Sequence, residues 1–399
     1  MARSNDVVTR SLAMKTAYLA WGILWIAWTQ CSAVGRDNVP ADTVSGAEAQ
    51  ISSGRAFPAK SVPEFSIRFK SIRTEAERAD PRTRATASQP DRSVSPGNLE
   101  RVLADAVKLA RAEAWDPNSL GVLTWLLSEY PKSRSANRAA RVLLARHRHD
   151  PAALKVAEQF AWMPIAWPTR VLRAIADDKQ LTQTARARAL YSLACGFQSQ
   201  RDYREDRQLE ARATQAFREL AATYPKLSHR GKPWPEIASA HLFEIEHLTL
   251  GKVAPNIHGE DLNGDHFSLH SYRGQVVLLD FWGDWCGPCR EIYEHGPRLL
   301  KQYAGRPFAI VGVNSDEDRT ILRRRVREVG VTWRVFWDGG KIGGPIATRW
   351  NVEGWPALYL IDHQGVIRSK YLRGESLDRA IETWVRQAER ANHTAAQSR

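Results

Sequence analysis

Hydrophobic positions change their spacing along this chain, and the changes divide it into segments. Between residues 98 and 249, apolar side chains recur every three to four residues, which is the period of one helical face. After residue 250, continuous apolar runs appear instead at 276–281 and 308–313, as in strands buried on both faces of a sheet. Residues 34–97 are rich in Ser, Thr, Pro, Ala, Arg and Asp and hold few apolar side chains. The pattern predicts a flexible linker, then a helical domain, then an α/β domain, with a short strand or helix near residues 65–72 as an alternative within the linker.

The segment 98–249 is expected to form a stack of helices with hardly any strand. Pro131 and Pro225 each follow a tyrosine at the end of a helical pattern, which resembles the second helix of a tetratricopeptide-type unit. A strict 34-residue period is absent, so we predict a helical-repeat-like array without assigning its family. Two roles stay open for it, a spacer and a docking surface for a protein partner. Cys195 is interpreted as a buried small hydrophobe, with a resolving or regulatory thiol as the alternative.

Strand and helix patterns alternate over residues 251–391, which we take as the second domain. Asn263 and Gly264 between apolar flanks predict a two-residue hairpin turn in which both residues have positive φ. This order of elements favours an α/β sandwich with a mixed sheet and helices on its faces. The expected strands and helices are 276–281, a helix to about 303, 308–313, 320–329, 333–337, 357–361, 366–371 and 376–391.

The first 33 residues have the pattern of an export signal. Arg3, Arg10 and Lys15 precede an uncharged stretch at 16–28, which is shorter than the roughly 20 residues that span a bilayer. Cleavage after Ala33 is the expected outcome, and an uncleaved membrane anchor is the alternative. Cys31 lacks the small-residue lead-in of a lipoprotein. We therefore expect an exported protein of the periplasm or cell envelope.

The position of the first translated residue is also open at the N-terminus. Met14 and Lys15 form a compact alternative start, so Met1 and Met14 both stay open as the first residue.

Charge narrows the range of partners. The chain carries a formal net charge of +13, but residues 251–399 hold 21 Lys and Arg against 18 Asp and Glu. The basic excess therefore lies in the first 250 residues. No basic and aromatic recognition motif accompanies it, so nucleic acid is not an expected partner. Contact with a membrane through the N-terminal segment is possible on this charge pattern.

Cys286 and Cys289 are the chemical centre of the sequence. Two cysteines separated by two residues, where a strand gives way to a helix, are placed for reversible disulfide chemistry. The helix N-terminus is expected to lower the pKa of Cys286 below its usual value of about 8.5. Cys286 would then attack a substrate disulfide, and the more enclosed Cys289 would resolve the mixed disulfide.

Asp280 is the unusual residue of the apolar strand that leads to the cysteines. Burial should raise its pKa and make it a proton acceptor for Cys289. The alternative is an aspartate satisfied by local hydrogen bonds, with no catalytic role.

The residues around Asp280, Cys286 and Cys289 closely resemble those of a known protein family. Residues 281–289 resemble the thioredoxin active site, and 271–282 with the preceding hairpin resemble the exported TlpA/ResA branch of the thioredoxin superfamily. The similarity covers about residues 251–390. It implies a thioredoxin fold in which Gly354, Trp355 and Pro356 form a cis-proline loop opposite the cysteines. The backbone of Trp355 would pair with a substrate strand, and Trp285 would offer an apolar surface.

Two departures from the family pattern concern substrate binding. Trp355 is larger than the residue common before the cis proline in this family. The range of substrates and the reduction potential therefore do not follow from the resemblance. Residues 338–345 form an extra Gly-rich loop, which we interpret as a mobile loop that faces the substrate rather than a phosphate cradle.

The sequence thus predicts a thiol–disulfide oxidoreductase acting on protein substrates, in the reducing direction. Its redox unit is the cysteine pair, so it needs an external electron donor and no cofactor or metal. One alternative is an interaction scaffold whose helical array binds a partner. Another is a thiol peroxidase, disfavoured because Gly283 occupies the threonine position of a Thr-x-x-Cys site. A zinc site lacks further ligands near Cys286 and Cys289.

Overall fold

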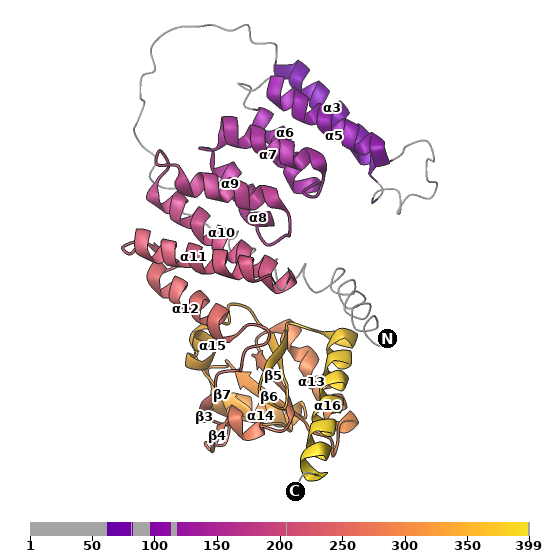
Figure 1. The fold of residues 1–399 in the computed structure, drawn as a ribbon, viewed down its shortest axis with the longest axis vertical. Helices are drawn as coiled ribbons and strands as arrows, with labels where there is room; N and C mark the ends of the chain where they lie inside the picture. Colours follow the sequence, from indigo (N-terminus) through magenta and orange to yellow (C-terminus); the bar gives the residue numbers. More distant parts are fainter. Residues whose placement is uncertain (1–61, 81, 83–95, 113–117, 205, 398–399) are drawn as a thin grey trace. The chain divides into compact units, whose positions relative to one another are not determined.

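The computed structural model describes residues 62–80, 82, 96–112, 118–204 and 206–397 (Figure 1). They form two units that divide between Leu227 and Ser228. The expected signal or anchor at 1–33, with Cys31, Ala33 and both candidate starts, lies outside the described residues. Within the described ranges, no helix is both long and apolar enough to cross a membrane.

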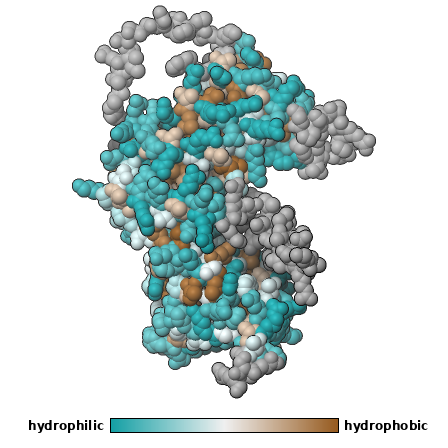
Figure 2. Space-filling model, in the orientation of Figure 1, coloured by the Kyte–Doolittle hydropathy of each residue, from teal (hydrophilic) through white to brown (hydrophobic). Residues whose placement is uncertain are grey.

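The N-terminal unit is a stack of helices, in agreement with the all-α prediction. Each helix packs on the next helix along the chain. Some helices also contact the one after that, as in the pairs α5 and α7, α7 and α9, and α8 and α10. Such neighbour-to-neighbour packing is the arrangement of a linear helical array. In Figure 2 the visible face of this unit is mostly hydrophilic. The helices are α3 (Val62–Ala79), α5 (Pro96–Ala112), α6 (Asn118–Glu129), α7 (Arg134–His147), α8 (Pro151–Phe160), α9 (Ala166–Asp177), α10 (Gln183–Arg204) and α11 (Arg207–Thr223).

Several of these helices begin at side-chain caps. The side chains of Ser133, Asp150 and Asp206 accept hydrogen bonds from backbone N–H groups in the first turns of α7, α8 and α11. Each cap satisfies a donor that the helix itself leaves unpaired. Pro151 at the start of α8 fits because its missing N–H is not needed there.

Residues 62–79 form a helix inside the segment 34–97, which was predicted as a linker with only a short strand or helix left open near 65–72. They form α3, which packs on α5 and α6. Its buried positions Phe65, Ala76 and Ala79 lie on one face, and the ring of Phe69 is 5.4 Å from that of Trp125. The apolar residues are few but keep a helical spacing, so a short helix gains its stability from the partner helices.

A five-stranded mixed sheet forms the centre of the C-terminal unit, as predicted. Its order is β7-β6-β5-β8-β9. β5 is parallel to β6 and antiparallel to β8, while β6 is parallel to β7 and β8 antiparallel to β9. Every residue of β5 and β6 is buried, as expected at the middle of a covered sheet. The strands are β5 (Val276–Trp282), β6 (Phe308–Asn314), β7 (Val335–Trp337), β8 (Ala357–Ile361) and β9 (Ile367–Lys370).

Helices cover this sheet and fix the ends of its strands. α16 (Gly374–Gln397) contacts β5, and α13 (Ile292–Gln302) contacts β6. The two helices lie side by side in Figure 1. They are joined by a contact between Nε2 of His295 on α13 and Oδ1 of Asp378 on α16, 2.7 Å apart. The other helices are α14 (Arg319–Glu328) and the short α15 (Pro345–Arg349).

Helix α12 (Trp234–His247) belongs to the C-terminal unit, whereas the sequence analysis placed it in the helical domain over 98–249. The carboxylate of Glu244 accepts hydrogen bonds from Lys370 of β9 at 2.6 Å and from Asn351 at 2.8 Å. Both charged side chains are buried. A charge pair between distant elements leaves no local signal, so the predicted boundary lies too far along the chain.

The predicted hairpin forms, but its turn is longer than two residues. β3 (His258–Glu260) pairs with β4 (His266–Ser268), and residues 261–265 connect them. Gly264 has φ 98°, while Asn263 is not among the residues with positive φ. The carboxylate of Asp261 accepts the N–H groups of Asn263 and Asp265 at 2.8 and 3.1 Å. This side-chain turn replaces the two-residue turn that the Asn-Gly pair indicated.

Candidate active site

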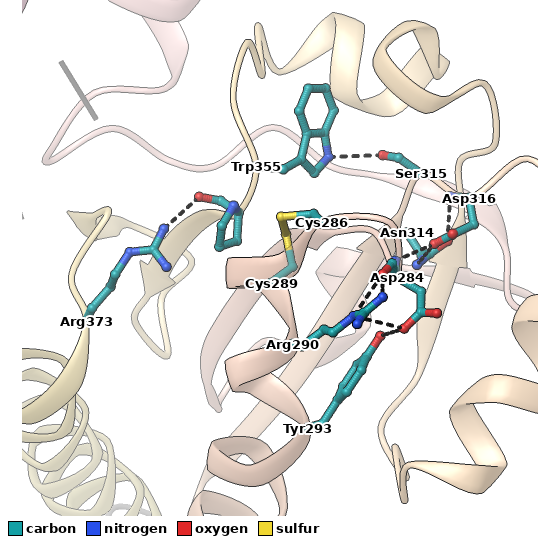
Figure 3. The surroundings of a disulfide bond; sticks show 11 residues. Asp284, Cys286, Cys289, Arg290, Tyr293, Asn314, Ser315, Asp316, Trp355 and Arg373 are labelled. Carbon is teal, nitrogen blue, oxygen red and sulfur yellow. Dashed lines mark hydrogen bonds and ion pairs between the residues drawn. A yellow bond between two sulfur atoms is a disulfide. The ribbon is translucent and has the colours of Figure 1, made fainter. Parts of the chain in front are cut away.

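The two cysteines lie where β5 ends and a helix begins (Figure 3). A 3-10 helix, η2 (Gly287–Glu291), starts directly after Cys286 and leads into α13. Cys286 is the capping residue with extended backbone, and the N–H of Cys289 donates to its carbonyl at 3.1 Å. The sulfur of Cys286 is thus attached at the positive end of the helix, where a thiolate is favoured.

A disulfide joins Cys286 and Cys289, whose Cα atoms are 5.3 Å apart. Cys286 is 7% exposed and Cys289 2%. Figure 3 shows the bond facing the loop that carries Trp355. Both cysteines are thus buried, and Cys286 is the more exposed of the two.

The loop opposite the disulfide holds Gly354, Trp355 and Pro356 directly before β8. The peptide bond between Trp355 and Pro356 is cis, as the family resemblance implies. Nε1 of Trp355 donates to the hydroxyl of Ser315 at 3.2 Å, and its ring centre is 5.7 Å from that of Trp285. Trp285 is 44% exposed. Two tryptophans, one held and one exposed, therefore lie at the disulfide.

Asp280 lies inside β5, opposite Gly312 of β6 and Leu358 of β8. It is 1% exposed, and its Oδ1 has no hydrogen-bond partner. Burial raises the pKa of Asp280 to about 7, although the nearby Arg373 acts in the opposite direction. Local hydrogen bonds thus leave one carboxylate oxygen unsatisfied, and the group is poised to exchange a proton near neutral pH.

Arg373 is a part of this site that the sequence analysis did not single out. Its guanidinium donates to the carbonyl of Pro356 at 3.0 Å (Figure 3). Burial lowers the pKa of Arg373, while the charges of Glu291 and Asp280 raise it. One side chain therefore holds the proline loop and acts electrostatically on the buried acid. It lies between β9 and α16, far from any motif, so no pattern in the sequence indicates it.

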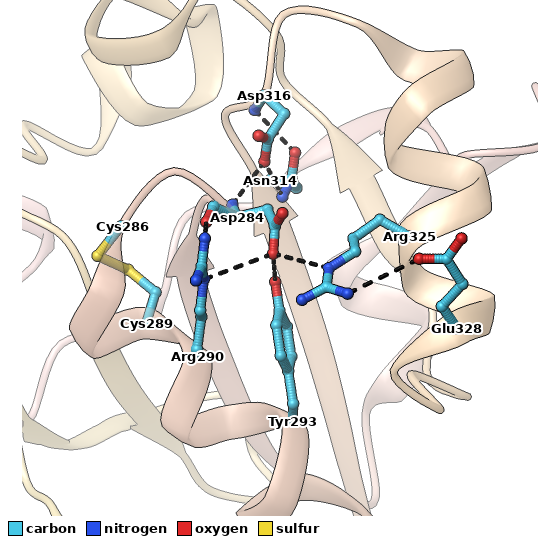
Figure 4. A network of polar contacts seen from close by, with 9 residues as sticks. All are labelled: Asp284, Cys286, Cys289, Arg290, Tyr293, Asn314, Asp316, Arg325 and Glu328. Atoms are coloured by element: carbon cyan, nitrogen blue, oxygen red, sulfur yellow. Dashed lines mark hydrogen bonds and ion pairs between the residues drawn. A yellow bond between two sulfur atoms is a disulfide. The ribbon is translucent and has the colours of Figure 1, made fainter.

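Asp284 anchors the loop that presents Trp285 and Cys286 (Figure 4). Its backbone N–H donates to the carboxylate of Asp316 at 2.8 Å, and its carbonyl accepts two N–H groups of Arg290 at 3.0 and 2.8 Å. Its carboxylate accepts the hydroxyl of Tyr293 at 2.6 Å and Nε of Arg325 at 3.2 Å. Burial acts to raise the pKa of Asp284, but these two hydrogen bonds and the charges of Arg325 and Arg290 together hold the pKa below its usual value. Only the nearness of Asp284 and Arg290 to the cysteines could have suggested this network.

Gly283 leaves space that Trp285 fills. A side-chain carbon added at Gly283 would collide with the indole ring of Trp285. A threonine at this position is therefore incompatible with the present placement of Trp285, which bears on the peroxidase alternative.

The Gly-rich loop at 338–345 is anchored beside the same site. The carboxylate of Asp338 accepts the N–H groups of Ile346 and Ala347 at 2.6 and 2.9 Å. The N–H of Lys341 donates to the carbonyl of Ser315 at 2.9 Å, so Ser315 contacts both this loop and Trp355. The loop thus has fixed ends next to the predicted substrate surface.

Other predicted chemistry falls outside the site. Cys195 lies on α10 of the helical unit, is partly buried and takes no part in a disulfide. Within the described ranges, no group of three or more His, Cys, Asp and Glu residues is arranged to hold a metal ion.

The C-terminal part of this chain is similar to known proteins. Residues 250–370 match the AhpC/TSA family. A thioredoxin-like protein, YneN of Bacillus subtilis, is 31% identical over 121 residues, which are 30% of this chain and 68% of that protein. This chain belongs to the thioredoxin-like family. The thiol-disulfide oxidoreductase ResA of Bacillus thuringiensis is 28% identical over 141 residues, covering 35% of this chain and 79% of ResA.

Solved structures are also similar to this thioredoxin-like chain. The thioredoxin domain of a thiol-disulfide oxidoreductase from Bacteroides vulgatus is 30% identical, with a TM-score of 0.32 and coverage of 34% of this chain and 98% of that domain. A thiol:disulfide interchange protein DsbE from Chlorobium tepidum, described as putative, is 26% identical, with a TM-score of 0.31 and coverage of 35% and 96%. The relatives by sequence confirm the predicted family and the predicted class of enzyme, a thiol–disulfide oxidoreductase.

Proposed function

We propose that this thioredoxin-like enzyme reduces disulfides of protein substrates in the cell envelope. The observation that carries the proposal is the Cys286–Cys289 disulfide at the helix N-terminus, facing a cis-proline loop and backed by a buried acid. The reducing direction rests on the Gly-Pro pair between the cysteines. The envelope location rests on the export signal expected at residues 1–33.

The first step forms a mixed disulfide. The thiolate of Cys286 attacks one sulfur of the substrate disulfide, and the other substrate sulfur leaves as a thiolate that takes a proton from water. The greater exposure of Cys286 supports its assignment as the attacking residue.

The second step releases the substrate. Cys289 loses its proton to Asp280, and its thiolate attacks the sulfur of Cys286. The second substrate sulfur leaves as a thiolate, the protein disulfide forms again, and the substrate has gained two electrons. A pKa of about 7 for Asp280 means that a large fraction of it is ionised and able to accept this proton at neutral pH.

Substrate binding is assigned to Trp285, Gly354, Trp355 and Pro356. Trp355 lies in the loop directly before β8 that faces the disulfide, and we assign its backbone to pair with an extended segment of the substrate. The exposed ring of Trp285 offers apolar contact beside Cys286. The helical array would act as the binding surface for a further protein partner.

Each turnover leaves the cysteines oxidised, so an external electron donor must return two electrons. The cysteine pair performs the exchange itself, and the proposal includes no cofactor or metal.

The test measures insulin reduction with dithiothreitol as the electron donor. We expect catalysis by the wild type and a loss to the uncatalysed rate in Cys286→Ser. Cys289→Ser should accumulate mixed disulfides that mass spectrometry can identify, which also names the natural substrates when cell extracts are used. Cys195→Ser is the matched control and should keep full activity. Equal rates for the wild type and Cys286→Ser would overturn the proposal.

A thiol peroxidase is the second candidate, because the matching family profile is that of AhpC/TSA. The collision between a side chain at Gly283 and Trp285 argues against a Thr-x-x-Cys site. Peroxide consumption coupled to thiol oxidation decides between the two. We expect at most a slow rate with hydrogen peroxide, and a rate above that with insulin would favour the peroxidase.

A further inference from the structure

The helical unit contains a groove with its own chemistry. It lies among α9, α10 and α11, is open to solvent and has a volume of about 620 Å³, within the roughly 300–1,000 Å³ range of protein ligand sites. Guanidinium groups from two helices share it with small apolar positions. Its lining residues are Ala166, Thr169, Arg170, Arg173, Ala174, Asp177, Phe197, Arg212 and Gln215.

The charges of this groove are not balanced. Arg173 contacts Asp177 at 3.4 Å and Glu219 at 3.1 Å. Arg170 and Arg212 are exposed, and among the described residues neither forms an ion pair with a carboxylate. The guanidinium of Arg212 lies over the ring of Phe197, 4.9 Å from the ring centre, and both residues line the groove. Two positive charges are therefore available to a ligand, over a partly apolar floor.

We propose that this groove binds an acidic segment of a partner protein. Guanidinium groups form paired hydrogen bonds with carboxylates, and Asp or Glu side chains spaced along a peptide can reach both arginines. Ala166, Ala174 and the Phe197 ring offer contact to the aliphatic parts of the same peptide. This binding site takes no part in the disulfide chemistry. It assigns to the helical unit a negatively charged peptide as its ligand.

The occupant is taken to be another protein rather than this chain or a membrane. Residues 1–61 of the chain hold four acidic and six basic residues, a poor match for a basic groove. Binding to an anionic bilayer favours protruding basic and apolar side chains, whereas these arginines line a hollow.

The test uses the full chain and two fluorescent 14-residue peptides. One carries six Asp and Glu residues spaced by Gly, Ser and Leu, and the other has Asn and Gln in their place. Fluorescence anisotropy should give at least tenfold tighter binding of the acidic peptide at low salt. The double variant Arg170→Glu/Arg212→Glu should weaken that binding at least tenfold and leave insulin reduction unchanged.

The matched control is Arg138→Glu/Arg218→Glu, which changes the same total charge at exposed arginines of the same unit outside the groove. It should keep the wild-type affinity. Equal binding of the two peptides, or equal loss in both double variants, would overturn the proposal. So would binding to phosphatidylglycerol vesicles that depends on Arg170 and Arg212 while the acidic peptide does not bind. Circular dichroism of each variant shows that it is folded.

Discussion

The ionisation of Asp280 links the stability of the protein to its chemistry. The usual pKa of this carboxyl is 3.8, and burial raises it to about 7. A raised pKa means that the folded state favours the protonated acid. The stability that follows from this preference is complete below pH 4 and is lost as the pH rises through 7. At neutral pH the folded protein therefore keeps a carboxyl whose ionisation costs stability, which fits the proton-acceptor role proposed for it.

Replacing Asp280 by Asn should therefore change stability in a pH-dependent way. Relative to the wild type, Asp280→Asn should gain on the order of 4 kcal/mol between pH 4 and pH 8, since about three pKa units are involved. Urea unfolding of the oxidised proteins at both pH values measures this difference. A constant difference at the two pH values would contradict the raised pKa.

Arg373 should set the pH at which Asp280 acts. Arg373→Gln removes the cation that lowers the pKa of Asp280, so we expect the pH midpoint of the resolving step to rise by about one unit. Arg373→Lys should restore the midpoint but raise KM for protein substrates, because it loses the guanidinium geometry at the carbonyl of Pro356.

The control is Arg379→Gln, an exposed arginine on α16 that pairs with Glu375. It should leave both quantities unchanged. An unaltered midpoint in Arg373→Gln would show that this arginine holds only the loop.

At this scale the sequence predicted the residues of the motif but not those that support it. Cys286, Cys289 and Asp280 lie close together in sequence, and the cis-proline loop followed from the resemblance. Arg373 and Asp316 come from distant segments and contribute single side chains, which leave no pattern of spacing. Ser315 belongs to the same class, because its importance lies in contacts with Trp355 and Lys341.

Among the elements, α12 shows how tertiary contacts decide a domain boundary. Its helical period continues the pattern of the preceding helices, yet Glu244 forms a buried ion pair with Lys370 of β9. Burial acts to raise the pKa of Glu244, but the charges of Lys370 and His241, with the hydrogen bonds from Lys370 and Asn351, together lower the pKa. α12 is therefore part of the thioredoxin-like unit in structural terms.

Removing one partner of this pair should be costly. Glu244→Leu leaves Lys370 buried without its carboxylate, and we expect a loss of about 3–5 kcal/mol in the free energy of unfolding. The double variant Glu244→Leu/Lys370→Met should recover most of it. Thermal and urea unfolding measure both.

An exposed pair gives the comparison. Glu375→Ala removes the partner of Arg379 and should cost less than about 1 kcal/mol. Equal costs for Glu244→Leu and Glu375→Ala would show that α12 contributes little to the unit.

The spacing of apolar residues predicted the bounds of helices and strands well where buried positions follow one another regularly. The prediction placed β8 at its observed bounds and β5 and β6 to within a residue, because both faces of these strands are apolar. It left only a short strand or helix open near residues 65–72 and did not predict the full length of α3, where Phe65, Ala76 and Ala79 are scattered among charged residues. It also shortened the hairpin loop, since the carboxylate of Asp261 decides that turn.

For the whole molecule, the predicted export decides in which compartment the enzyme acts. A reductant in an oxidising compartment requires electrons from elsewhere, so location determines which donors are available. We expect fractionation of the native host to place the protein in the envelope, with Val34 as its first residue by mass spectrometry. A cytosolic protein that retains Met1 or Met14 would contradict export.

The contact between Gly283 and Trp285 has a consequence for the evolution of this enzyme. Because a side chain at Gly283 collides with the indole, a threonine is tolerated only after Trp285 has been replaced or moved. Replacement of Trp285 alone would first remove an apolar surface beside Cys286. The effect of a substitution at Gly283 therefore depends on which residue occupies position 285, so the two positions are coupled.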